Sequence, residues 1–305
     1  MNRLTRFLAL VVAGVLPASA QAAPAGCTES CMLNIADTYL GSLTANDLTG
    51  TPFATKVRWT ENGKDFGAGE GIWKTATAWS YRHTIVDPEA GGIATFGSVE
   101  EANGKRAIVA IRLKVVGRLI TESEVMVARE GDFGLFNTDA VEAKPIFGQV
   151  LPIEDRVTRE RLKAIAESYF NGISRADPAS VPFHPDCNRV ENGVQTTNNP
   201  PRMTMSCYES LRRFTYMSNH RETRFPVVDT KRGLVLAITA FDMPVMHLKT
   251  MIRGRPHEIS PELQHLPRTL FLYELFKVEG GNIRQIEAEM RNAPLSASMG
   301  WGSDR

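Results

Sequence analysis

The chain has 305 residues, of which 43% are hydrophobic and 23% are charged, and its formal net charge is +1. This composition excludes a collagen-like, disordered or disulfide-dense chain, and the lack of a basic excess excludes a nucleic-acid binder held by phosphate contacts. At roughly 150 residues per domain, the length predicts about two globular domains.

The first residues, 1–23, have the pattern of a secretory signal peptide. Two arginines precede an apolar run over 7–16, and small-residue cleavage sites follow it. A membrane-spanning helix needs about 20 apolar residues, so the run predicts export without membrane insertion. We therefore expect a periplasmic or secreted protein. Lipidation at Cys27 is the alternative, and Pro24 disfavours it because a lipoprotein signal has leucine there.

Four cysteines in an exported chain predict two disulfides, for which three pairings are possible. Cys187 and Cys207 bracket a polar loop, and closing that loop is the natural choice. Cys27 and Cys31 lie four residues apart at an expected helix start, and the first helical turn decides whether they can be bridged. No C-x-x-C or H-E-x-x-H motif is present, so we expect no metal.

The sequence repeats itself about 130 residues further along the chain. At an offset of 130, residues 35–63 match residues 165–193 at nine identical positions. Both stretches end in Glu-Asn-Gly. Such ordered identity predicts two homologous domains.

Further along, the offset grows to 142 and then to 163, so the second copy carries two insertions, around 195–207 and 246–267. After the signal peptide, the repeat predicts a first domain over 27–145 and a second domain over 156–292. A linker over 146–155 joins them, and a tail over 293–305 follows.

Each copy is expected to open with an amphipathic helix, over 32–45 and 159–176, because apolar residues recur there at helical spacing. A strand ending in Glu-Asn-Gly follows, and then a helical segment over 71–79 or 207–217. Three strands are expected to close the first copy: 81–86, 107–116 and 119–128. A helix followed by long strands predicts an α+β domain, with helices packed on one face of a curved antiparallel sheet.

This order of elements, with strands closing on Gly117, Ile120 and Glu124, resembles the nuclear-transport-factor-2-like superfamily. The superfamily includes ketosteroid isomerase, scytalone dehydratase and the polyketide cyclases. The Glu-Asn-Gly turns, Gly-Glu-Gly-Ile-Trp at 69–73 and Gly-Trp at 300–301 are also similar to a poorly characterised family of exported fungal and bacterial proteins. The resemblance implies two tandem cone-shaped domains, a fold that hosts both enzymes and binding modules.

His83 is the leading catalytic candidate. Side chains alternate along a strand, so His83 and Ile85 share a face, and the second copy has Phe225 and Val227 there. We expect this face to be the apolar, concave one. An imidazole on it titrates near neutrality and can pass a proton, the role that histidine has in the resembling dehydratases. The alternative is a core histidine bonded to a backbone carbonyl.

Glu274 corresponds to Ile111 of the first copy, on an apolar face. Desolvation there would raise its pKa and make it an acid or base of the second domain. The alternative is an edge position open to water or paired with an arginine. Arg112, on the opposite face, is a candidate to stabilise an oxyanion, with a solvated strand residue as the alternative.

Asp37 and Tyr39 lie on the first helix, which covers the pocket mouth in the resembling superfamily. The resemblance implies that such residues polarise a carbonyl and move a proton. Their retention as Glu167 and Tyr169 favours a core role instead.

The remaining binding candidates are repeated polar residues and aromatic residues that suit a pocket wall. For the repeated pairs, the alternative is a structural ion pair formed once in each copy. They are Arg82 and Arg224, Glu61 and Glu191, Trp73, and Tyr169.

Together these features predict a cofactor-independent lyase, of dehydration or elimination type, or an isomerase. Its substrate would be a small apolar molecule, with aromatic compounds among the candidates, and we expect no nucleic acid as a partner. The competing interpretation is a non-catalytic exported module that binds a small molecule or a protein. Duplication favours a monomer with its two domains paired face to face, and a homodimer is the alternative.

Overall fold

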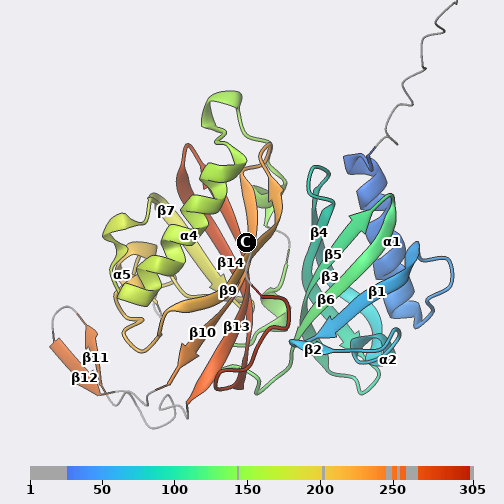
Figure 1. Cartoon of the computed structure of the whole chain (residues 1–305). Helices are drawn as coiled ribbons and strands as arrows, with labels where there is room; N and C mark the ends of the chain where they lie inside the picture. The colour runs from blue at the N-terminus through green and yellow to red at the C-terminus, as the bar shows by residue number, and fades with distance from the viewer. Residues whose placement is uncertain are drawn as a thin grey trace, which may run out of the picture.

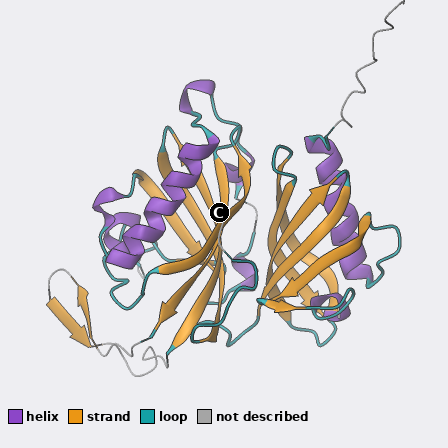
Figure 2. Cartoon of the chain, viewed as in Figure 1, coloured by secondary structure: helices purple, strands orange, loops and turns teal. Residues whose placement is uncertain are grey.

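The computed structural model describes residues 26–142, 144–200, 203–244, 249–252, 255–258 and 267–302. The expected signal peptide lies outside them. The chain forms two tandem α+β domains, each with a six-stranded sheet and few helices, as the sequence predicted (Figures 1 and 2). Within the described residues, no helix is long and apolar enough to cross a membrane.

The first domain opens with α1 (Glu29–Ala45), which begins where the Thr28 hydroxyl accepts a hydrogen bond from the backbone of Cys31. Its sheet has the strand order β2-β1-β6-β5-β4-β3. The remaining elements are β1 (Phe53–Glu61), β2 (Lys64–Asp65), α2 (Ile72–Thr75), β3 (Ala76–Asp87), β4 (Gly92–Glu101), β5 (Arg106–Val116) and β6 (Leu119–Ala128).

The second domain repeats this plan. Its helix α4 (Arg159–Arg175) is capped by Thr158 as α1 is by Thr28, and its strand order is β8-β7-β14-β13-β10-β9. A short helix, α3 (Pro145–Gly148), lies between the domains. The other elements are β7 (Phe183–Glu191), β8 (Val194–Gln195), α5 (Cys207–Leu211), β9 (His220–Asp229), β10 (Leu234–Met243), β13 (Arg268–Glu279) and β14 (Asn282–Pro294).

In the second insertion, the described residues form a hairpin of β11 (Lys249–Ile252) and β12 (Arg255–Glu258). The rest of that predicted insertion lies outside the described residues.

Both disulfides are present, as Cys27–Cys31 and Cys187–Cys207. The second closes a loop of 20 residues and holds β7 to α5. Two disulfides indicate an oxidising compartment.

Both sheets are mostly antiparallel, as predicted, and each also contains one parallel pair, β1 with β6 and β7 with β14. Two details of the predicted secondary structure are wrong. The helical segment expected over 71–79 ends at Thr75, where β3 begins, and α5 ends at Leu211. Strand β4 was not predicted. It is buried on both faces, so its sequence lacks the alternation that marks a half-buried strand.

The two domains pack sheet against sheet. Helix α1 covers the outer face of the first sheet and α4 covers the outer face of the second, at opposite sides of the molecule in Figure 1. The inner faces share one apolar cluster, to which Ile85 and Phe96 contribute from the first domain and Val227, Leu236 and Ile238 from the second. The predicted face-to-face pairing is therefore present within one chain.

Each Glu-Asn-Gly turn contacts the chain segment that follows the last strand of the other domain. In the second domain, the backbone carbonyl of Asn192 accepts a hydrogen bond from the backbone N–H of Asn137, which follows β6. A Cβ on Gly193, whose φ is +77°, would lie 2.1 Å from the carbonyl oxygen of Asn137. A Cβ on Gly63, with the same φ, would lie 2.5 Å from that of Ser298, which follows β14. Glycine is required at both turns for conformation and for this close approach.

Candidate functional site

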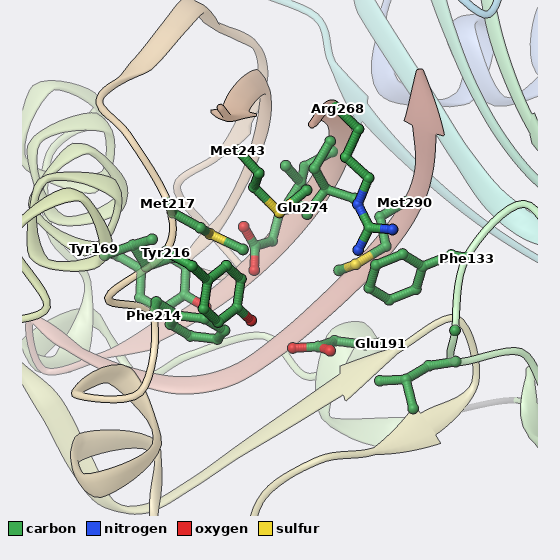
Figure 3. Close-up of a pocket in the computed structure, with 15 residues that line it drawn as sticks. Phe133, Tyr169, Glu191, Phe214, Tyr216, Met217, Met243, Arg268, Glu274 and Met290 are labelled. Atoms are coloured by element: carbon green, nitrogen blue, oxygen red, sulfur yellow. The ribbon is translucent and has the colours of Figure 1, made fainter. Parts of the chain in front are cut away.

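A cavity of about 230 Å³ opens on the face of the second sheet that α4 covers (Figure 3). Its walls are mostly apolar and include three methionines and several aromatic rings. The lining residues are Phe133, Gly134, Leu135, Tyr169, Ile173, Glu191, Phe214, Tyr216, Met217, Met243, Arg268, Leu270, Leu272, Glu274 and Met290.

Strand β13 supplies one side of the cavity by simple alternation. Arg268, Leu270, Leu272 and Glu274 are two residues apart and therefore share a face. Tyr169 stands opposite them on α4. The segment after α5 and the stretch 133–135, which leaves the first domain, close the remaining sides.

Glu274 is the most unusual group in this pocket. It is 1% exposed, and its Oε2 has no hydrogen-bond partner among the described residues. Burial raises the pKa of Glu274 to about 8, and the charge of Glu191 adds to the rise, while Arg189 and the Tyr169 hydroxyl oppose it. At neutral pH the carboxyl is therefore mostly protonated and can donate a proton.

Beside Glu274 lies a buried ion pair. Nε of Arg189 is 2.7 Å from Oε1 of Glu191, and the guanidinium also donates to Thr196 and Ser210. Burial alone would lower the pKa of Arg189, but the charge of Glu191 outweighs it and keeps the arginine charged. Two carboxyl groups in unlike environments thus line one cavity, because Glu191 is paired with Arg189 whereas Glu274 has no ion-pair partner among the described residues.

In the first domain, apolar residues occupy the positions equivalent to Arg189 and Glu274. Arg189 corresponds to Trp59 and Glu274 to Ile111. The rings of Tyr39 and Trp73 are 5.1 Å apart, those of Trp59 and Trp73 are 6.0 Å apart, and the Tyr39 hydroxyl is hydrogen-bonded to Ser123 at 2.8 Å. Trp73 and Tyr39 are therefore core residues in this domain.

His83 does not lie on the concave face, as expected, but between the two sheets. Its ring stacks on Phe147 of α3, with centroids 5.4 Å apart. Burial lowers the pKa of His83 to about 4, and the charges of Lys144 and Arg232 lower it further, so it does not titrate near neutrality. The face is apolar because it packs against the second domain.

The two repeated arginines lie on different faces, contrary to the sequence alignment. Arg82 forms an exposed ion pair with Asp37 of α1 at 3.0 Å. Arg224 is buried and holds Glu124 of the first domain through two hydrogen bonds of 2.6 and 3.0 Å. A bulge in β9 opposite Leu236 and Ile238 places one extra residue there and reverses the faces.

Arg112 and Glu61 also lie outside the pocket. Arg112 pairs with Glu122 and lies 3.7 Å from Glu124, within the contact between the domains. Glu61 accepts a hydrogen bond of 2.8 Å from the backbone of Ile72 at the start of α2. Of the predicted site residues, the structure brings together Tyr169, Glu191 and Glu274.

Sequence reasoning did not find Arg189, Arg268 or Phe133. Arg189 had a usable signal, because it replaces Trp59 in the other copy, as Glu274 replaces Ile111. Arg268 borders an insertion, and at the offset of 163 it corresponds to another cation, Lys105, so no difference in charge between the copies marks it. Phe133 reaches the pocket only because its segment docks on the second sheet.

Comparison with known proteins gives a family and no activity. No curated protein matches the chain. Among solved structures, a protein of unknown function with a cystatin-like fold from Methylobium petroleophilum PM1 is 17% identical, with a TM-score of 0.30, over 37% of this chain and 86% of that one. The family described as a domain of unknown function (DUF8021) matches residues 27–127 and 155–290, one stretch on each domain. The chain belongs to this family.

Proposed function

We propose that the second domain binds a small, largely apolar molecule and transforms it by proton transfer, without a cofactor. The reaction is a dehydration, a related elimination or an isomerisation. One observation carries the proposal: the buried Glu274 carboxyl, whose pKa is raised to about 8, lies with an unpartnered oxygen in an apolar cavity that also contains Glu191, the ion-pair partner of Arg189. Two carboxyl groups in unlike environments are suited to the roles of acid and base.

In an elimination, the Glu191 carboxylate takes the proton from the carbon next to the leaving group, and a carbon–carbon double bond forms. The carbon–oxygen bond breaks, and the Glu274 proton moves to the leaving hydroxyl, which departs as water. Exchange with solvent then returns both groups to their starting states. In an isomerisation, Glu191 moves the proton between carbons, and Glu274 and Tyr169 donate hydrogen bonds to the enolate oxygen.

The arrangement of the domain supports this proposal. A long helix over a curved sheet, with the pocket between them, resembles the nuclear-transport-factor-2-like superfamily, in which isomerases and dehydratases use such a pocket. We infer that the protein works in the periplasm or outside the cell, in keeping with its two disulfides. Fold alone does not define the reaction, so the pocket residues must be tested directly.

The test is incubation of the protein with a small-molecule extract, followed by mass spectrometry of bound and free molecules. We expect the wild type to retain a small apolar compound and to convert it, with loss of one water or with unchanged mass and altered retention time. Glu274→Gln should retain the compound and convert it at least 100-fold more slowly, since general acid–base catalysis contributes about 10²–10⁴-fold.

His83→Ala is the matched control, because His83 lies between the sheets and outside the pocket. It should leave conversion unchanged. Turnover lost in His83→Ala but kept in Glu274→Gln would overturn the assignment to this pocket. A bound molecule recovered unaltered from the wild type would favour the non-catalytic binding module instead.

A further inference from the structure

Arg268 is a cation in the pocket wall that no described acidic residue neutralises. It lines the cavity, and its Nε is buried without a hydrogen-bond partner among the described residues. Burial lowers the pKa of its guanidinium, and Tyr216 opposes the shift. A partly buried charge without a counter-ion destabilises the protein, so a residue kept in this state has a use for a negative charge from outside.

Arg268 and Glu274 both line the cavity from the same face of β13. They are six residues apart, so two intervening residues of that face separate them. Figure 3 shows the Arg268 guanidinium beside Phe133 and Met290, and the Glu274 carboxyl near Met217 and Met243. Between them the strand presents only Leu270 and Leu272 to the cavity. A cation, an apolar stretch and a hydrogen-bond donor therefore follow one another along the pocket.

We infer that the ligand is a small apolar monocarboxylic acid whose carboxylate pairs with Arg268 and which presents a carbonyl or hydroxyl oxygen, set apart from the carboxylate, to Glu274. This inference rests on the proposed function and names its substrate class. A guanidinium binds a carboxylate through two parallel hydrogen bonds, which a neutral group of the same shape cannot match. A cavity of about 230 Å³ limits the apolar body to less than a drug-sized molecule.

The test compares two probes with the same skeleton, 4-oxo-4-phenylbutanoate and its primary amide, by titration calorimetry on the full chain. We expect the wild type to bind the acid at least tenfold more tightly than the amide. Arg268→Gln should remove that preference by weakening the acid alone, and Arg268→Lys should keep part of it. Arg212→Gln removes the same charge from an exposed residue outside the pocket and should keep the full preference.

Each outcome separates this inference from the proposed function. Equal binding of acid and amide to the wild type, or equal weakening of both by Arg268→Gln, overturns the carboxylate assignment. If Glu274→Gln still slows conversion of the compound retained from the extract in that case, the proposed function stands. If the acid preference depends on Arg268 but Glu274→Gln converts the retained compound as fast as the wild type, the Arg268 assignment stands and the role of Glu274 falls. Binding of neither probe overturns the carboxylate assignment, and the proposed function is then decided by conversion of the extract compound in the wild type and in Glu274→Gln.

Discussion

At the residue scale, the candidate site consists of differences between two copies of one domain. Tyr39 and Tyr169 occupy the same position in the two copies and are buried in both domains, but the residues around them differ. In the first domain Trp59 and Ile111 fill the space, whereas in the second Arg189 and Glu274 bring charge into an apolar cavity. Buried ionisable groups destabilise a fold, so their presence in only one copy indicates a use other than stability.

The first prediction concerns stability against pH. The folded pKa of Glu274 is about 8, above its ordinary value of 4.5, so between these values the folded chain holds a proton that the unfolded chain has lost. Stability linked to this group is complete below pH 4.5 and is lost as pH rises through 8, by up to about 1.4 kcal/mol per pH unit.

Urea unfolding at pH 5 and pH 9 measures this effect when the wild type is compared with Glu274→Gln. We expect the variant to gain at least 1–2 kcal/mol on the wild type between the two pH values. Other buried carboxyls with raised pKa values, such as Glu289, are present in both proteins and cancel. A difference that does not change with pH would contradict the raised pKa.

How much of the site the sequence could predict depended on whether a residue differed in character from its counterpart in the other copy. Glu274 was found because Ile111 stands at its place in the other copy. His83 was placed on the wrong surface, because alternation gives the apolar face of a strand but not what covers that face. The second domain covers it here, a long-range contact that no local pattern encodes.

At the element scale, one bulge in β9 decides what two aligned arginines do. Arg82 remains on the helix-covered face and meets Asp37 near the surface. Arg224 turns to the inner face and meets Glu124, which also accepts a hydrogen bond of 2.9 Å from Tyr273. An extra residue in one strand thus converts a surface ion pair into a buried link between the domains.

These arginines give a matched pair of substitutions. Arg224→Met leaves Glu124 buried without its main counter-charge, and we expect it to lower the free energy of unfolding by about 3–5 kcal/mol. Arg82→Met breaks an exposed ion pair and should change it by no more than about 1 kcal/mol. Thermal or urea unfolding of both variants measures these losses. Equal losses of unfolding free energy would contradict the proposed difference in burial between the two ion pairs.

At the scale of the whole molecule, the two domains exchange the segments that leave them. The stretch after β6 supplies Phe133 to the second domain's pocket, and the stretch after β14 carries Trp301 back to β1. Trp301 donates a hydrogen bond of 2.9 Å to Thr60 and lies under the guanidinium of Arg58 at 3.9 Å. The repeated fold was predictable from aligned identities, whereas this exchange was not, because the exchanged segments share no sequence.

Substitutions in the segment after β6 and in the segment after β14 should have separate effects. Trp301→Ala should lower stability by about 2 kcal/mol, through lost packing and the lost cation–π contact, and leave ligand binding in the second domain unchanged. Phe133→Ala should weaken ligand binding, because it removes a wall of the cavity. Unfolding curves and titration with 4-oxo-4-phenylbutanoate on both variants check this. Loss of ligand binding in Trp301→Ala would show that the two segments do not act separately.

The central claim is that the ligand site of this chain is the pocket of the second domain. It is tested most directly by NMR of the protein with ¹³C-labelled methionine methyl groups, titrated with acetophenone, a small aromatic ketone. The pocket contains Met217, Met243 and Met290, whereas Met32 lies in the core of the first domain. We predict saturable shifts of the three pocket methyl signals and none of Met32. Shifts of Met32 alone, or no saturable shift at any pocket methionine, would contradict the account.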